Sequence, residues 1–447
     1  MHDTYKHHIK STITLAYPVA VGQLGHVMMG VVDSLFVGRL GAVQLAAASI
    51  ANSIFFLIFV IGLGITFAIS PLVAIAVGSK KTNECSIILR HGLIINLISA
   101  FILIAIIFTC SYFISYLNQP PDVAVLAAVY LRIVGISILP LMIFQTFRQF
   151  IEGLSIMRPA MVITIVANIV NALGNWLLVF GKAGFPELGF EGSALATLIT
   201  RFFMAFVIIF YILNSRRYKQ YHIEFSIRKM EFPIVKKILT IGLSSGFQYF
   251  FEVGAFSSAA IIIGWIGTKE LAAHQIALNL ASISYMAITG ISAAAAIRVG
   301  NAIGRGISSE VRRAGFSAII LAAILEFISG ILFIIFRGFF PTLYINDHQV
   351  IQVASMLLII AALFQISDGV QAVAIGALRG ITDVKMPTFI TFISYWVLGL
   401  PVGYLLAFNL NYGVRGVWIG FIVGLTASAL LLTSRFHFRS RNSNVCG

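Results

Sequence analysis

The chain has 447 residues, of which 59% are hydrophobic and only 10% are charged, and its formal net charge is +14. Ordinary globular domains carry about 25% charged residues, whereas the mean hydropathy of this chain is +0.97. These values exclude a water-soluble domain and indicate an integral membrane protein.

Twelve apolar segments long enough to span a membrane can be counted along the chain. A helix of about 20 apolar residues crosses the hydrocarbon core of a bilayer. The predicted spans are residues 13–36, 45–72, 87–115, 124–147, 160–181, 191–213, 236–264, 271–297, 312–337, 351–376, 387–408 and 413–434. The sequence therefore predicts an all-α membrane protein with twelve transmembrane helices.

A long polar connector follows the sixth predicted span. It covers residues 214–230 and divides the chain into an amino-terminal lobe, residues 1–213, and a carboxy-terminal lobe, residues 231–447. Each lobe would hold six of the twelve predicted helices.

The two halves also resemble each other in sequence. A shift of 226 positions places residues 44–80 over residues 270–306 without a gap, and 11 of these 37 positions are identical. Glycines coincide in this alignment, for example Gly64 with Gly290. Because each repeat has an even number of spans, the lobes are expected to share one orientation. They would be related by a pseudo-two-fold axis along the membrane normal.

The basic residues are distributed unevenly between the two sets of connections. If the amino terminus is cytoplasmic, 23 of the 30 lysines and arginines lie on the cytoplasmic side. This pattern follows the positive-inside rule and predicts that both termini are cytoplasmic. Contact between basic loops and anionic lipid accounts for the net charge, so no nucleic-acid partner is expected.

Three of the carboxylates inside apolar spans are candidates for a functional role: Asp33, Glu252 and Asp368. An acidic side chain near the bilayer centre costs roughly 2.5–3.5 kcal/mol on insertion scales, and such residues usually have a function. Glu252 and Asp368 belong to the same predicted lobe and are expected to converge on one cation. The cation would be Na⁺, which prefers oxygen ligands; alternatively, the pair holds a proton near neutral pH.

Two asparagines are candidates for a polar site with Asp33. Asn171 and Asn175 are four residues apart, so they share one face of a helix and can present amide oxygens together. Hydrogen bonding between helices is the alternative role. Glu326 also lies in an apolar span, and a structural role within its own lobe is favoured for it.

Other side chains are weaker candidates for lining a substrate cleft. His26 and Met28 are two of them, although packing is the favoured interpretation for both. Gln275 and Asn279 share a face of the eighth span, where they either border the cation site or join helices by hydrogen bonds.

No enzymatic motif is present in the sequence. It contains no Walker A loop, no HExxH motif and no nucleophile elbow. The protein is therefore expected to be neither an enzyme nor an ATP-driven pump, and to need no cofactor. An ion gradient or a partner protein would supply the energy for transport.

Several motifs, taken in order, resemble the multidrug and toxic compound extrusion (MATE) family over nearly the whole chain. They are Ala16-Tyr17-Pro18, Gln23, Val32-Asp33, Gly38 and Gly41; Asn171 and Asn175 with Gly181, Pro186, Gly189 and Gly192; and Glu252, Leu271 to Asn279 and Ile297-Arg298-Val299-Gly300. Acidic residues in the seventh and tenth spans are similar to the NorM-like branch. The DinF-like branch carries its acidic residues in the amino-terminal lobe.

This resemblance implies a secondary transporter that exports amphipathic, cationic organic compounds as Na⁺ or H⁺ flows inward. Glu252 and Asp368 would bind the coupling cation, and Asp33, with Asn171 and Asn175, would form the polar site of the amino-terminal lobe. NorM-like proteins tend to carry a tyrosine four residues before the tenth-span aspartate. This chain has Phe364 there, which removes a hydroxyl ligand and leaves a ring as a possible cleft-lining group.

Two other classes of transporter are alternatives to this one. A flippase for lipid-linked precursors, of the same wider superfamily, would favour arginines that bind phosphate, whereas the buried charges here are expected to be acidic. A major facilitator carrier would need a basic signature loop after the second span, where this chain reads Ser79-Lys80-Lys81-Thr82-Asn83. The expected state is a monomer in the bacterial inner (plasma) membrane.

Overall fold

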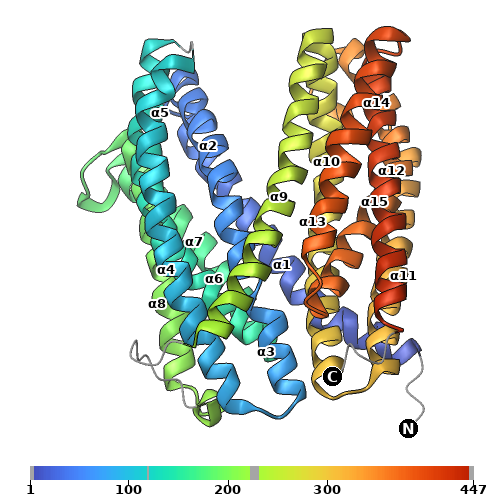
Figure 1. Cartoon of the computed structure of the whole chain (residues 1–447). Helices are drawn as coiled ribbons and strands as arrows, with labels where there is room; N and C mark the ends of the chain where they lie inside the picture. The colour runs from blue at the N-terminus through green and yellow to red at the C-terminus, as the bar shows by residue number, and fades with distance from the viewer. Residues whose placement is uncertain (1–4, 118–119, 222–230, 442–447) are drawn as a thin grey trace. The chain divides into compact units, whose positions relative to one another are not determined.

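The computed structural model describes residues 5–117, 120–221 and 231–441, and all regular structure in these ranges is helical (Figure 1). The same ranges contain 12 helical stretches that are long and apolar enough to cross a membrane. This confirms the predicted all-α class and the predicted number of spans. The helices are α1 (Tyr5–Gly38), α2 (Ala42–Thr66), α3 (Ile69–Gly78), α4 (Thr82–Phe113), α5 (Pro121–Ile136), α6 (Ile138–Gly153), α7 (Arg158–Phe180), α8 (Gly189–Asn214), α9 (Phe232–Ile266), α10 (Thr268–Gly304), α11 (Ser308–Ile335), α12 (His348–Gly380), α13 (Lys385–Phe392), α14 (Leu400–Tyr404) and α15 (Val414–Arg439).

The helices extend further than their apolar segments. The first span covers Lys6–Gly38 and the tenth covers His348–Gly380, where hydropathy predicted 13–36 and 351–376. Apolar length measures only the part of a helix inside the hydrocarbon core. The polar turns at each end stay helical because their backbone groups still bond within the helix. Of the predicted connector, residues 222–230 lie outside the described residues.

Two of the spans are interrupted by a proline. Pro71 follows the junction of α2 and α3 and lies four residues after Phe67; Pro140 follows the junction of α5 and α6 and lies four residues after Ile136. A proline has no N–H for the carbonyl four residues earlier, and its ring clashes with that carbonyl. The helix therefore breaks near that earlier residue in both spans.

The eleventh span widens where it contains Pro401. Between α13 and α14 the chain forms a π-helical segment, Ile393–Gly399, and a second one follows at Leu405–Asn409. Pro401 removes the N–H that would bond to Val397 inside the first of them. The wider π turn accommodates this loss and is a feature often found at functional sites.

Each of two compact units combines parts of both sequence halves. One unit contains Met1–Ala20 and Phe247–Gly447, and the other contains Val21–Gly246. The sequence repeat suggested a division at the polar connector, whereas packing divides the chain within α1 and α9. The early part of α1 therefore belongs with the second half, and the early part of α9 with the first.

Close backbone contacts of glycines explain why α1 and α9 are shared in this way. A Cβ atom on Gly290 of α10 would lie 3.0 Å from the backbone nitrogen of Ala20 in α1. In the other unit, Gly64 of α2 and Gly246 of α9 leave no room for a Cβ between them. The shift of 226 positions relates Gly64 to Gly290 and Ala20 to Gly246. The internal repeat thus builds the same helix contact once in each unit.

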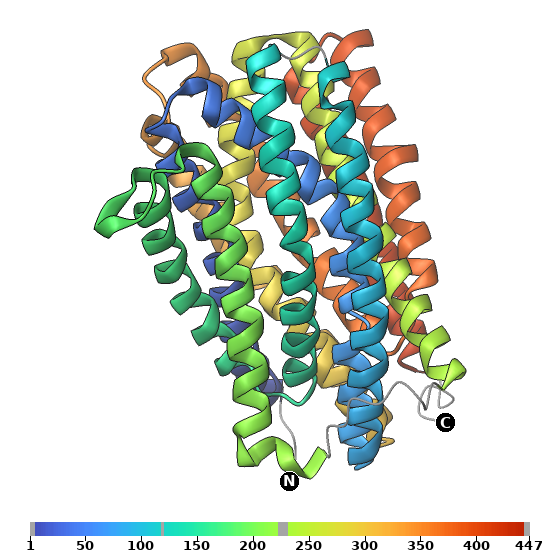
Figure 2. The same cartoon turned by 90° about the vertical axis from the view of Figure 1, so that its left-hand side faces the viewer.

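The unit of residues 21–246 has an aromatic and aliphatic core. Phe55 and Phe59 of α2, Tyr130 of α5 and Met142 of α6 are buried there. Tyr130 also stacks on Phe190 of α8, with ring centroids 4.9 Å apart. Figure 2 shows α4, α5 and α8 of this unit running alongside one another. This packing fixes the rotation of α5 and α8 next to Asp33.

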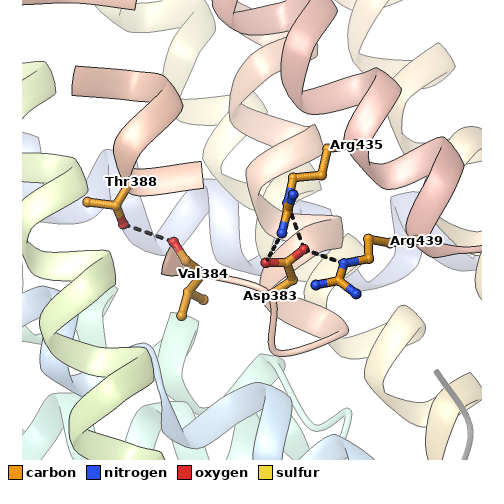
Figure 3. Close-up of polar contacts among 5 residues, drawn as sticks. All are labelled: Asp383, Val384, Thr388, Arg435 and Arg439. Carbon is orange, nitrogen blue, oxygen red and sulfur yellow. Dashed lines mark hydrogen bonds and ion pairs between the residues drawn. The ribbon is translucent and has the colours of Figure 1, made fainter. Parts of the chain in front are cut away.

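A loop between α12 and α13 is held to the end of α15 by an ion-pair cluster (Figure 3). Asp383 accepts two hydrogen bonds from Arg435, at 2.8 and 2.9 Å, and one from Nε of Arg439, at 3.1 Å. The two arginines are four residues apart and so share one face of α15. Bidentate pairing of this kind fixes geometry as well as charge.

Replacing Asp383 by asparagine is expected to destabilise the protein by on the order of 2 kcal/mol, because hydrogen bonds to charged groups are among the stronger ones. Arg435 is only 22% exposed and would lose its counter-charge. The measurement is the melting temperature of the detergent-purified protein. Arg439→Gln is the matched control: this arginine is 50% exposed, so its loss should lower the melting temperature less. Equal losses would contradict the assignment of Arg435 as the main partner.

Candidate functional site

Asp33 lies at the centre of a buried hydrogen-bond cluster in the unit of residues 21–246. Its Oδ1 accepts hydrogen bonds from the amides of Asn171, at 3.0 Å, and Asn175, at 2.8 Å. Its Oδ2 accepts one from the hydroxyl of Thr197, at 2.8 Å. Asp33 is 7% exposed, and the two asparagines are fully buried. Three donors on two oxygens match the needs of an ionised carboxylate.

Three helices supply this cluster. Asp33 is on α1, the two asparagines are on one face of α7, and Thr197 is on α8. The Oδ1 atoms of Asn171 and Asn175 have no hydrogen-bond partner among the described residues. Each amide thus donates to Asp33 and keeps an oxygen that a cation can use. The structure brings together the three residues that the sequence analysis grouped.

An arginine accompanies Asp33. Arg201 of α8 is four residues after Thr197, on the same face, and is close enough to Asp33 for charge attraction. Its guanidinium lies over the ring of Phe55, 4.6 Å from the centroid, and donates to the hydroxyl of Ser137 at 2.5 Å. The charge of Asp33 is therefore partly balanced within its own unit.

Glu252 and Asp368 lie near each other in the other unit, on α9 and α12. They are close enough for charge repulsion. Oε1 of Glu252, a residue that is 7% exposed, accepts a hydrogen bond from the hydroxyl of Tyr285 on α10 at 2.9 Å. Gln371 lies one turn after Asp368 and approaches its Oδ1 at 3.4 Å. The same Gln371 amide donates to the hydroxyl of Tyr395 at 2.5 Å.

Tyr395 reaches this cluster from the first π-helical segment, Ile393–Gly399. Tyr395 lies inside this segment, and π-helical turns of this kind are frequent at functional sites. Four elements thus contribute oxygen atoms around Glu252 and Asp368: α9, α10, α12 and the π segment. Carboxylate and hydroxyl oxygens are the ligands that hard monovalent and divalent cations prefer.

A small pocket lies next to Glu252 within this unit. Its volume is about 10 Å³, which is space for one water molecule, and its lining includes Gln248, Tyr249, Thr289, Ser292 and Arg379. Arg379, 7% exposed, attracts the carboxylate of Glu252. The expectation that the buried charges are all acidic is therefore wrong. The distribution of basic residues predicts a cytoplasmic position for Arg379, whereas the structure buries it in the lining of the pocket beside Glu252.

The possible cleft-lining residues are not gathered at either acidic cluster. Gln275, Asn279 and Met28 are exposed on their helices. Phe364 is 2% exposed and packs against Trp418 and Phe421, with ring centroids 5.4 and 6.4 Å away. It is a core residue of its unit.

His26 is one of the same candidates and is partly buried on α1. Its ring contacts the edge of Phe144, with centroids 6.2 Å apart. Packing against α6 is thus the ring contact that the described residues show for His26.

Several residues of the two clusters escaped the sequence analysis. Thr197, Tyr285, Gln371 and Tyr395 are ordinary polar residues of apolar spans, and threonine and tyrosine are common there. For Thr197 and Arg201 a signal existed, since their spacing of four places them on one face of the sixth span. Tyr395 lies in the π-helical segment Ile393–Gly399, which the sequence analysis did not predict.

The chain was compared with known proteins. The MatE family profile matches residues 18–177 and 245–405. Two curated relatives are 35% identical: "Probable multidrug resistance protein NorM" of Agrobacterium fabrum, over 96% of this chain and 93% of that protein, and "Multidrug resistance protein NorM" of Photobacterium profundum, over 98% and 97%. The crystal structure of the eukaryotic MATE transporter AtDTX14 has a TM-score of 0.89 at 21% identity, and the match covers 98% of both chains.

These matches extend over both sequence halves and nearly the full length of the relatives. The profile covers Asp33 and Glu252 together with their asparagine and tyrosine partners, and it also covers Asp368. The fold likeness to AtDTX14 agrees with the twelve helical spans found in the described residues. The chain is thus a multi-pass membrane protein that belongs to the MatE family of transporters and is related to the NorM proteins.

Proposed function

We propose that the protein exports amphipathic, cationic organic compounds by antiport with Na⁺ or H⁺. It would act as a monomer in the bacterial inner membrane, with both termini in the cytoplasm. The names of the NorM relatives, multidrug resistance proteins, support export of more than one compound. Because several substrates share one pathway, their common features, positive charge and apolar surface, would be what the protein recognises.

The observation that carries this proposal is the cluster of Glu252 and Asp368. The two carboxylates, on α9 and α12, repel each other, and burial removes the water that would otherwise screen them. Arg379 offsets one of the two negative charges. The remaining negative charge can be neutralised by one monovalent cation. Tyr285 and Tyr395 place hydroxyl oxygens at the same cluster.

Coupling requires that the cation and the substrate favour different states of the protein. A ligand shifts a two-state equilibrium only by its difference in affinity for the two states. A cation at Glu252 and Asp368 would relieve their repulsion and stabilise the state in which they are close. A cationic substrate would compete for the same negative charge, so binding of one would favour release of the other.

Transport of a lipid-linked phosphate remains the second candidate, because Arg379 and Arg201 are held beside the two acidic clusters. A guanidinium is suited to phosphate oxygens. Each arginine, however, already faces a carboxylate. An anionic headgroup would meet that carboxylate as well, which disfavours the binding of phosphate at these positions.

The test is efflux of a fluorescent organic cation from proteoliposomes under a Na⁺ gradient or an H⁺ gradient imposed separately. Acceleration by one gradient would support antiport and identify the coupling ion. Efflux that is insensitive to both gradients would overturn the proposal. Movement of a fluorescent lipid phosphate between leaflets, measured in the same vesicles, would then favour the second candidate.

A further inference from the structure

Glu326 is a third buried carboxylate of the unit that contains Glu252 and Asp368, and the proposed antiport does not use it. It lies on α11, is 2% exposed, and has no hydrogen-bond partner for its Oε2 among the described residues. The ion pairs found in the described part of the chain do not include it. A buried carboxylate in this state is costly unless a positive charge or a proton accompanies it.

The only hydrogen-bond donor that Glu326 meets in the described residues is the hydroxyl of Ser284 on α10. That hydroxyl has a single proton, which also points to the carbonyl of Ala281 at 3.0 Å. Ser284 therefore cannot satisfy the carboxylate alone. Glu326 therefore needs a proton or a cation to offset the cost of its burial.

A second unpartnered oxygen belongs to the same group of side chains. Gln365 of α12 donates its amide to the hydroxyl of Ser284 at 2.5 Å and approaches that of Ser329 at 3.5 Å. Its Oε1 has no partner among the described residues, although Gln365 is only 2% exposed. Glu326 and Gln365 thus meet at Ser284, and each has one buried oxygen with nothing to bind.

The backbone is shaped to let Glu326 approach α12. A Cβ atom on Gly369 would lie 2.7 Å from Cγ of Glu326. Any larger residue would therefore push the glutamate away, and the glycine allows it to pack beside Asp368. Asp368 is close enough to Glu326 for charge repulsion. The third carboxylate is thus part of the electrostatic environment of the first two.

The charges in this region do not balance. Glu252, Glu326 and Asp368 carry three negative charges when ionised. Arg379 is the one arginine or lysine among the buried residues described for this unit. Two more positive charges are needed for neutrality, and one cation at Glu252 and Asp368 supplies only one of them.

We propose that Glu326 and Gln365 hold a second monovalent cation, H⁺ or Na⁺, in addition to the cation at Glu252 and Asp368. A proton on Oε2 of Glu326 would be donated to Oε1 of Gln365 and would satisfy both oxygens. A sodium ion would bind the same two oxygens with help from the hydroxyl of Ser329. The inference extends the proposed cation-coupled transport, which would then move two cations in each cycle.

The test measures bound cation in the absence of any gradient, so its result does not depend on whether the protein is an antiporter. The full chain is placed in nanodiscs as wild type, Glu326→Gln, and the double variant Glu252→Gln/Asp368→Asn. Binding of ²²Na⁺ at equilibrium reports sodium. Infrared difference spectra in H₂O and D₂O report the carbonyl band of protonated carboxyl groups.

Two outcomes would support the second site. If Glu326→Gln binds one ²²Na⁺ fewer than wild type, and the double variant still binds the ²²Na⁺ of the second site, the second cation is sodium. Loss of a protonated carboxyl band in Glu326→Gln, with the band retained in the double variant, would identify a proton. If Glu326→Gln changes neither signal, the second site does not exist, whatever the efflux experiment shows.

Two further variants distinguish loss of the second cation from a general effect of substitution on the fold. Gln365→Met keeps the size of the side chain but removes its oxygen; it should weaken ²²Na⁺ binding or move the carboxyl band to higher frequency as a hydrogen bond is lost. A merely structural glutamine would change neither. Glu310→Gln, on the same helix and paired with Arg305, should leave both signals as in wild type.

Discussion

Glu252→Gln is expected to abolish the acceleration of drug efflux by the ion gradient. We expect the gradient-driven rate to fall by about 10- to 100-fold, which corresponds to typical coupling free energies between two binding sites. The substitution keeps the hydrogen bond from Tyr285, because an amide oxygen can still accept it, and removes the negative charge. Asp368→Asn should have an effect of similar size, since the two carboxylates share one cation. The measurement is the initial efflux rate in proteoliposomes with and without the gradient.

Two comparisons separate coupling from damage to the fold. Glu187→Gln changes an exposed glutamate in the loop between α7 and α8 and should transport as wild type does. Tyr285→Phe removes one hydroxyl but leaves both carboxylates, so a smaller loss is expected. If Glu252→Gln keeps its response to the gradient, Glu252 does not bind the coupling cation.

Asp33→Ala is expected to lower the stability of the protein more than Asp33→Asn does. The alanine variant removes the acceptor of the Asn171 amide and the Thr197 hydroxyl and leaves the Asn175 amide only its bond to the backbone carbonyl of Asn171. Each unsatisfied donor costs about 1–3 kcal/mol. Because neighbouring side chains can re-pair, a total on the order of 3 kcal/mol is expected. Asparagine can still accept two of these hydrogen bonds. The measurement is the melting temperature in detergent.

Transport by the same two variants tests the function of this cluster. Asp33→Asn is expected to fold and to lose transport of organic cations, because the negative charge is gone while most hydrogen bonds remain. Asn168→Ala is a matched control on α7 and should transport as wild type does: Asn168 donates to the carbonyls of Gly25 and Thr164, and its hydrogen bonds found in the described residues do not include Asp33. Normal transport by Asp33→Asn would show that the cluster serves only to join α1, α7 and α8.

The amino-acid sequence by itself determined the class of the protein, the number of its spans and which acidic residues lie within those spans. Lipid cannot hydrogen-bond to the backbone, so every membrane-crossing segment of this all-helical protein must be an apolar helix of sufficient length. The length of each apolar segment can be measured from the hydropathy of the sequence. Asp33, Glu252 and Asp368 are conspicuous for the same reason. The spacing of Asn171 and Asn175 was also informative, because residues four apart on a helix must share a face.

Only the tertiary structure decided which side chains surround those acids. In a membrane, the lipid-facing and protein-facing sides of a helix are similarly apolar, so the sequence does not reveal how each helix is rotated. Tyr285 was therefore not recognisable as a partner of Glu252, and for Thr197 the sequence indicated only that it shares a helix face with Arg201. Tyr395 lies in a π-helical segment, and Arg379 is buried beside Glu252, neither of which the sequence analysis predicted. The placement of Glu326 beside Gln365 depends on how closely α11 approaches α12. Gly369 permits this close approach, but the presence of a glycine in the sequence does not predict it.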